Sequence, residues 1–233
     1  MDFSTPLVSA TFLRRYHRFL ADFQAQDGTI MTAHCANTGS MMGLLHPGAS
    51  AMLSRADHSK RKLAYTWELV HEHNSWVGIH TGRTNAIVRE ALERQGLPSL
   101  LAYQTIQSEV AVADKSRLDF RLDGDRLPPC FLEVKSVTLR QGNLAVFPDA
   151  VTERGRRHLE VLAQLKRNGA RSVLLFVVQR EDCHGFRPAG AIDPAYAATL
   201  RDVVQAGVEI LVQGCRVGPG GITLHHPIPW DLA

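Results

Sequence analysis

The sequence has few cysteines, and none of them are paired in a motif. Cys35, Cys130, Cys183 and Cys215 are separated by 95, 53 and 32 residues. Because no CxxC pair occurs, a zinc finger or a thioredoxin-type redox site is not expected. The first 19 residues also lack the basic segment followed by an apolar one that a secretory signal needs. We therefore expect four buried thiols in a cytoplasmic protein.

Long hydrophobic runs and a strong net charge are also missing. The longest clean apolar run, residues 173–178, is far shorter than the ~20 residues of a membrane-spanning helix, so no membrane association is expected. The net charge of +3 permits an anionic partner but does not require one. With 45% hydrophobic and 21% charged residues, the chain has the composition of a globular protein, which excludes disordered and fibrous classes.

The small basic excess is concentrated in two short segments near the N-terminus. The first is Arg14-Arg15-Tyr16-His17-Arg18 and the second is Lys60-Arg61-Lys62. We predict that these cations contact the phosphates of a nucleic acid, with an ordinary solvated surface as the alternative. The predicted contacts in these segments are Arg14, Arg15, Arg18, Lys60, Arg61 and Lys62.

The pattern of hydrophobic residues divides the chain near residue 83. Five short strands with intervening turns are expected at residues 19–23, 29–35, 51–54, 63–70 and 76–80. They favour a small β-barrel, with the OB fold as the candidate, over residues 1–83. Residues 84–233 then show the order α-β-β-β-α-β-α-β, which includes helices over 84–95, 150–168 and 195–206. The expected fold class is therefore α/β, with an OB-like barrel domain followed by an α/β domain.

Two strands of the second domain carry the most informative residues. Segments 116–122 and 131–137 flank a turn-rich stretch and predict a hairpin. If the hairpin pairs symmetrically about Arg126, Asp119 lies opposite Glu133, with their Cβ atoms ~4.5–5.5 Å apart. Alternation predicts Leu118, Phe120 and Leu122 together on one face, with Asp119 on the other.

Two opposed carboxylates repel each other, so this arrangement needs compensation. A divalent cation, Mg²⁺ or Mn²⁺, held by Asp119 and Glu133 would supply it, because Mg²⁺ prefers oxygen ligands. Glu109 is a candidate third ligand. Lys135, on the same face as Glu133, would stabilise charge or position a water. Asp119, Glu133 and Lys135 are thus the predicted catalytic residues, in the spacing of the PD-(D/E)xK nucleases, whereas a solvated strand edge is the simpler alternative.

The helix over 150–168 places polar side chains toward the same sheet. Its expected inward stripe is formed by Val151, Leu159, Leu162 and Leu165. Arg154 and His158 fall within this stripe, where polar groups need partners. We predict that both contact a phosphate bound at the carboxylate site, although ordinary buried salt bridges would also satisfy them.

Two other segments carry weaker signals. His71-Glu72-His73 resembles a metal-binding pair, although i and i+2 histidines on a strand favour a wet barrel face. The polar turn at residues 37–41 could offer backbone N–H groups to phosphates, although most such segments are only turns.

Several sequence blocks in order resemble the sugar fermentation stimulation protein A (SfsA) family. They include residues 18–22, 34 with 37–41, 60–62 with 65–69, 116–120, 133–139 and 147–155. Ala36 departs from the family, in which proline is expected. The resemblance implies an N-terminal OB-like domain, a PD-(D/E)xK nuclease-like αβββαβ domain and DNA binding. Asp119, Glu133 and Lys135 match the nuclease-like core, and Arg154 lies in the family's helix motif.

Three functions follow from these observations. The first is a Mg²⁺-dependent phosphodiesterase that acts on DNA. The second is a DNA-binding regulator of sugar metabolism, of the maltose type, without turnover. The third is a role in sugar metabolism in which the barrel holds a small ligand. The oligomeric state is left open.

Overall fold

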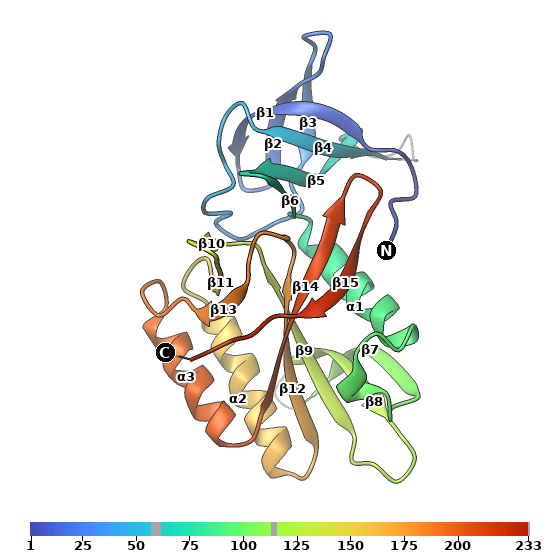
Figure 1. Cartoon of the computed structure of the whole chain (residues 1–233), viewed down its shortest axis with the longest axis vertical. Helices are drawn as coiled ribbons and strands as arrows, with labels where there is room; N and C mark the ends of the chain where they lie inside the picture. The colour runs from blue at the N-terminus through green and yellow to red at the C-terminus, as the bar shows by residue number, and fades with distance from the viewer. Residues whose placement is uncertain (57–61, 113–115, 233) are drawn as a thin grey trace.

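The structure, a computed structural model, describes residues 1–56, 62–112 and 116–232 and shows a β-barrel stacked on a larger α/β domain (Figure 1). The predicted phosphate contacts Lys60 and Arg61 lie outside the described residues. No helix among the described residues is long and apolar enough to cross a membrane. The four cysteines are buried and free, as the sequence predicted.

The N-terminal barrel is closed and has the OB strand order. Its strands are β1 (Val8–Tyr16), β2 (Leu20–Gln24), β3 (Ile30–His34), β4 (Ser50–Arg55), β5 (Tyr65–Glu72) and β6 (Ser75–Gly78). They follow the order β3-β2-β1-β4-β5-β6, and a parallel pairing of β3 with β5 closes β1–β5 into a ring. Phe12, Phe23 and Trp67 fill its core, where their rings stack or meet edge to face.

Strand β1 is absent from the five strands that the sequence predicted. Its register shifts between Phe12 and Arg14, which interrupts the alternation of buried and exposed side chains. The predicted strand over 76–80 corresponds to β6, which pairs with β5 at the edge of the sheet and is not part of the ring. The OB topology therefore depends on β1, a strand that the interrupted alternation of its side chains did not predict.

The α/β domain follows the predicted order and adds short strands. Its elements are α1 (Thr84–Glu93), β7 (Thr105–Ala111), β8 (Arg117–Asp123), β9 (Cys130–Val137), β10 (Arg140–Gln141), β11 (Leu144–Phe147), α2 (Glu153–Arg167), β12 (Arg171–Val178), β13 (Gly185–Pro188), α3 (Pro194–Gln205), β14 (Glu209–Gly218) and β15 (Gly221–Pro227). The 3₁₀ turns η1 (Thr81–Arg83) and η2 (Pro98–Leu100) flank α1. Strands β10, β11, β13 and β15 were not predicted.

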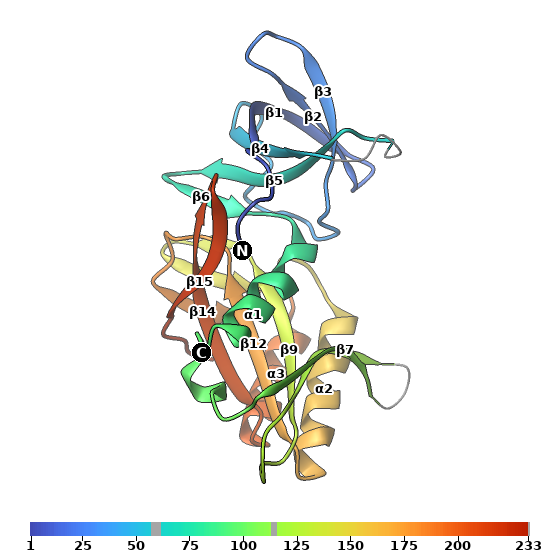
Figure 2. The ribbon, with the colours of Figure 1, turned by 90° about the vertical axis from the view of Figure 1, so that its right-hand side faces the viewer.

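The main sheet of this domain is covered on both faces. Its order is β15-β14-β12-β9-β8-β7, with α2 and α3 packed on one face and α1 on the other (Figures 1 and 2). Helix α2 begins at Glu153, and not at residue 150, because the Thr152 side chain caps it by accepting from Gly155 N–H at 3.0 Å. Val151 thus lies outside the helix and is 70% exposed, which corrects its place in the predicted stripe.

The β8–β9 hairpin has the predicted register over its turn-proximal part. Phe120 pairs with Leu132 and Leu122 pairs with Cys130, both symmetric about Arg126. The alternation prediction is wrong at Leu118, which packs in the core beneath α2 and α3, while Phe120 and Leu122 pack in the core beneath α1. The two strands part after the Phe120–Leu132 pair, and this local break occurs at Asp119.

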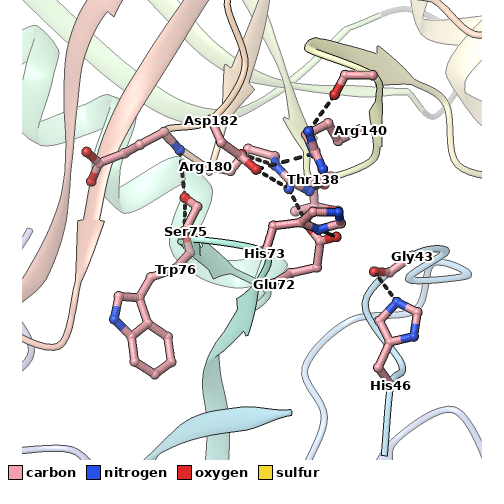
Figure 3. Close-up of polar contacts among 12 residues, drawn as sticks. Gly43, His46, Glu72, His73, Ser75, Trp76, Thr138, Arg140, Arg180 and Asp182 are labelled. Atoms are coloured by element: carbon pink, nitrogen blue, oxygen red, sulfur yellow. Dashed lines mark hydrogen bonds and ion pairs between the residues drawn. The ribbon is translucent and has the colours of Figure 1, made fainter.

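The barrel and the α/β domain meet through a buried ion-pair network. Arg180, which follows β12 and is only 2% exposed, donates to Glu72 at the end of β5 and to both oxygens of Asp182 at 2.6 and 2.8 Å (Figure 3). It also donates to the Thr138 carbonyl at 2.8 Å. Buried charges require such pairing, so this network fixes the two domains against each other.

Candidate active site

A cleft of about 1200 Å³ opens between the two domains. Its barrel side is formed by Arg15, Arg18 and the loop at residues 37–40. Its opposite side is formed by residues of β7–β9 and of the N-terminal part of α2. These include Glu109, Asp119, Glu133, Lys135, Arg154 and His158. The structure therefore gathers residues from both domains around the predicted carboxylates.

Asp119 lies where β8 leaves β9, and its side chain takes the place of a strand-pairing partner. One of its oxygens, Oδ2, accepts from the backbone N–H of Val134 at 2.7 Å, and the other accepts from the amide of Asn85 at 2.7 Å. Asn85 stands in the first turn of α1 and was not predicted as a site residue. No sequence signal marks it, because its contact with β8 depends on how α1 packs on the sheet.

Glu133 is the most buried acid of the site, with 3% of its surface exposed. Its Oε1 atom accepts from Lys135 Nζ at 2.6 Å and also contacts His158 Nδ1. Its Oε2 atom is buried and has no partner among the described residues. A buried carboxylate oxygen without a donor is costly, so this atom is a ready ligand for a cation.

The charges of the site act on one another. Burial and then the nearby Glu133 charge raise the pKa of Asp119 from 3.8 to about 6. Burial also acts to raise the pKa of Glu133, but the hydrogen bond with His158 and the charge of Lys135 outweigh it and hold that pKa below its ordinary value. Both acids are therefore ionised at pH 8, and two negative charges share one site.

The donor set fits a hard divalent cation. The available ligands are carboxylate oxygens, which suit Mg²⁺, Mn²⁺ or Ca²⁺. Among the described residues, no group of three or more His, Cys, Asp or Glu side chains could hold a metal. Glu109 is exposed and lines the cleft but does not complete such a group. Asp119 and Glu133 would thus hold a cation together with water or substrate oxygens.

The two polar residues that were predicted to face the sheet from α2 differ in burial. His158 is buried, and its Nδ1 atom contacts Glu133 Oε1. Arg154 is exposed and lines the cleft, which corrects the expectation that it lies on the buried stripe. Its Nε atom donates to His158 Nε2 at 3.4 Å. One turn of helix therefore links the cleft surface to the buried carboxylate.

The three arginines of the first basic segment make different contacts. Arg14 pairs with Asp22 at 2.8 Å. The Arg15 guanidinium donates to the carbonyls of Asn37, Gly39 and Ser40 and so fixes the barrel loop of the cleft. Arg18 makes no side-chain ion pair with the described residues and lines the cleft. Lys62 is exposed. Arg18 is thus the member best placed for a phosphate.

The loop at residues 37–41 is held across the cleft by an acid that the sequence did not single out. Asp149 accepts from Ser40 Oγ at 3.0 Å and from Met41 N–H at 3.0 Å. A Cβ atom at Gly39 would lie 2.9 Å from this carboxylate, so the close approach needs glycine. In the His71-Glu72-His73 segment, Glu72 contacts Arg180 of the α/β domain, and His73 contacts Glu72.

Comparison with known proteins identifies the family. Residues 13–79 match the SfsA N-terminal OB domain, and residues 82–221 match the sugar fermentation stimulation protein RE domain. The chain belongs to the sugar fermentation stimulation protein family. This confirms the predicted family and the fold class, an OB barrel followed by an α/β domain.

Relatives within the family resemble this chain along its length. A sugar fermentation stimulation protein homolog of Geobacter sulfurreducens is 50% identical over 224 residues, which cover 96% of each chain. A homolog of Magnetococcus marinus is 47% identical over 232 residues, with both chains fully covered. The solved structure of Pyrococcus furiosus SfsA in complex with Ca²⁺ has a TM-score of 0.90 and 29% identity, covering 99% of this chain and 98% of that one.

Proposed function

We propose that this member of the family binds DNA in the cleft between its domains and hydrolyses phosphodiester bonds there with Mg²⁺ or Mn²⁺. The observation that carries the proposal is the meeting of Asp119, Glu133 and Lys135 beside the cleft, where Glu133 Oε2 is buried and has no hydrogen-bond partner in the described part of the chain. Such an oxygen next to a second carboxylate supports binding of a divalent cation. That a relative's structure was solved in complex with Ca²⁺ agrees with this choice.

Each residue of the site has a distinct part in the proposal. Asp119 and Glu133 hold the cation, which when bound polarises the scissile phosphate and lowers the pKa of a water. Lys135, whose Nζ lies 2.6 Å from Glu133 Oε1, stabilises negative charge that develops on the phosphate. Arg154 and Arg18, on opposite sides of the cleft, bind the flanking phosphates.

The barrel contributes to binding through the segment between β1 and β2. Loops of this position contact oligonucleotides in OB folds. Here His17 and Arg18 both adopt positive φ angles, 48° and 60°, which residues other than glycine seldom adopt. The tight turn directs Arg18 into the cleft. We therefore propose residues 1–83 as the binding domain and residues 84–233 as the catalytic one.

The proposal is tested by a cleavage assay. Wild-type protein is incubated with single-stranded, duplex and branched DNA and with RNA, in the presence of Mg²⁺, Mn²⁺ or a chelator. We expect metal-dependent cleavage of at least one DNA, and a loss of ~10²–10³-fold in rate for K135M, the cost of removing one group that stabilises developing charge. Wild-type protein that binds DNA without cutting any substrate would refute hydrolysis and support the regulator hypothesis.

Arg154 and Arg157 provide a matched test of DNA binding. Both are exposed on α2 and carry the same charge, but only Arg154 lines the cleft. We expect R154M to weaken DNA binding and to reduce the slope of log K against log[salt] by about 1, because one phosphate contact is lost. R157M should change neither quantity. Fluorescence anisotropy over a salt series checks this, and equal losses in both variants would contradict the proposed path of the strand.

A further inference from the structure

A chain of three side chains runs from the cleft surface to the buried carboxylate. Arg154 Nε donates to His158 Nε2 at 3.4 Å, and His158 Nδ1 contacts Glu133 Oε1. Lys135 Nζ donates to the same Glu133 oxygen at 2.6 Å. All contacts of Glu133 to described side chains therefore converge on Oε1, and Oε2 is left without a partner.

The first contact of this chain decides where the proton of the imidazole lies. A guanidinium can only donate, so His158 Nε2 must accept from Arg154. In a neutral ring the proton is then on Nδ1, which donates it to Glu133. Arg154 thus selects the tautomer that holds Glu133, although it does not touch that carboxylate.

We propose that His158, backed by Arg154, is a positioning residue that orients Glu133 so that its Oε2 atom meets the divalent cation. This inference rests on the proposed function, because it assigns His158 a part in the same site. The carboxylate has two equivalent oxygens and could otherwise rotate or protonate. A donor fixed on one oxygen by a rigid, buried ring leaves the other in a single orientation.

The position of His158 also joins metal binding to substrate binding. Arg154 uses Nε for the histidine, while its two terminal nitrogens make no hydrogen bond to the described residues. A phosphate bound by these nitrogens would hold the guanidinium in place, and with it the tautomer of His158. The cation and the DNA should therefore strengthen each other's binding, as linkage requires.

Two amide variants separate positioning from packing. In H158N the donor nitrogen is bonded to Cγ, as Nδ1 is in histidine, so the contact with Glu133 Oε1 can be kept. In H158Q the donor lies one bond further out and cannot take the same place. H158L removes the donor altogether. Binding of Mn²⁺ alone to the full chain is measured by isothermal titration calorimetry at pH 8, with circular dichroism as the check of folding.

We expect H158N to bind Mn²⁺ within about threefold of wild type, and H158Q and H158L to lose ~10–100-fold in affinity, the usual effect of removing a partner of a metal ligand. If H158L does not fold, the comparison of H158N with H158Q still tests the positioning role. Equal Mn²⁺ affinity in all variants, or a loss in H158N as large as in H158Q, would overturn the positioning role alone. Wild-type protein that binds no Mn²⁺ would instead refute the proposed metal site itself.

Discussion

D119N should abolish metal-dependent cleavage and at the same time stabilise the metal-free protein. The carboxamide can accept from Val134 N–H with its oxygen and can donate to Asn85 once the Asn85 amide turns over, so both hydrogen bonds at this position can be kept. What is lost is one of the two charges that hold the cation. Because metal catalysis contributes several kcal/mol and ~1.4 kcal/mol is tenfold, we expect a rate loss of about 10³-fold or more.

The stabilising effect of D119N should depend on pH. The pKa of Asp119 is raised from 3.8 to about 6 by burial and by Glu133. The folded protein thus holds a proton that the unfolded chain releases between these values, and stability falls as the pH rises from about 4 to 6. Above this window the ionised Asp119 costs the folded state at most ~3 kcal/mol.

Thermal unfolding without metal checks this expectation. D119N should raise Tm at pH 8, where Asp119 is ionised, and leave it nearly unchanged at pH 4, where Asp119 is protonated. Added Mn²⁺ should raise the Tm of wild type at pH 8 but not that of D119N. A lower Tm for D119N at pH 8 would contradict the repulsion between the two acids, and an unchanged cleavage rate would remove Asp119 from the catalytic site.

R180M should destabilise the protein by up to ~3–5 kcal/mol, because it removes a buried arginine and takes its partner from the half-buried Glu72, while Asp182 keeps its ion pair with Arg140 at 3.3 Å. Arg180 is 2% exposed and is bound to Glu72 of the barrel and to Asp182 of the α/β domain. Its loss removes the arginine that donates to the Glu72 carboxylate at the contact between the domains (Figure 3). We expect the coupling between the barrel and the α/β domain to weaken, because the Arg180–Glu72 pair is gone, while the contacts of Asp149 with Ser40 and Met41 remain.

Urea unfolding followed by tryptophan fluorescence and circular dichroism measures this effect. R89M serves as the control, since Arg89 and Glu93 form an ion pair on the surface of α1, 46% and 54% exposed. A loss of no more than ~1 kcal/mol is expected there. The double variant R180M/E72Q should recover part of the loss, because it removes the unpaired charge. A small effect of R180M, or no recovery in the double variant, would show that the network does not join the domains.

The extent to which the sequence predicted the site differs from residue to residue. The hairpin register about Arg126 could be predicted, because the turn formers and the alternation of β8 and β9 are local properties. The same reasoning placed Leu118 on the wrong face, since the strands part at Asp119. This break reflects the side-chain contact of Asp119 with Val134 N–H, which no alternation rule contains.

The basic segment near the N-terminus also shows what local sequence could not predict. Charge alone marked Arg14, Arg15 and Arg18 as equivalent phosphate contacts. In the structure Arg14 is neutralised by Asp22 and Arg15 binds three carbonyls of the loop at residues 37–40. Only the position of each side chain relative to its neighbours separates a residue that supports the cleft from one that faces it.

By itself the sequence predicted the family and the larger elements of the α/β domain, and it singled out the acids and lysine of the hairpin as candidates, because periodicity, turn residues and motif spacing are encoded over short distances. Tertiary structure decided which oxygen of Glu133 lacks a partner among the residues that the structure describes, that His158 and Asn85 contact the two carboxylates, and that Arg180 pairs with Glu72 across the domains. These contacts link residues from 25 to 108 positions apart. They depend on how helices and strands pack, which no local pattern specifies.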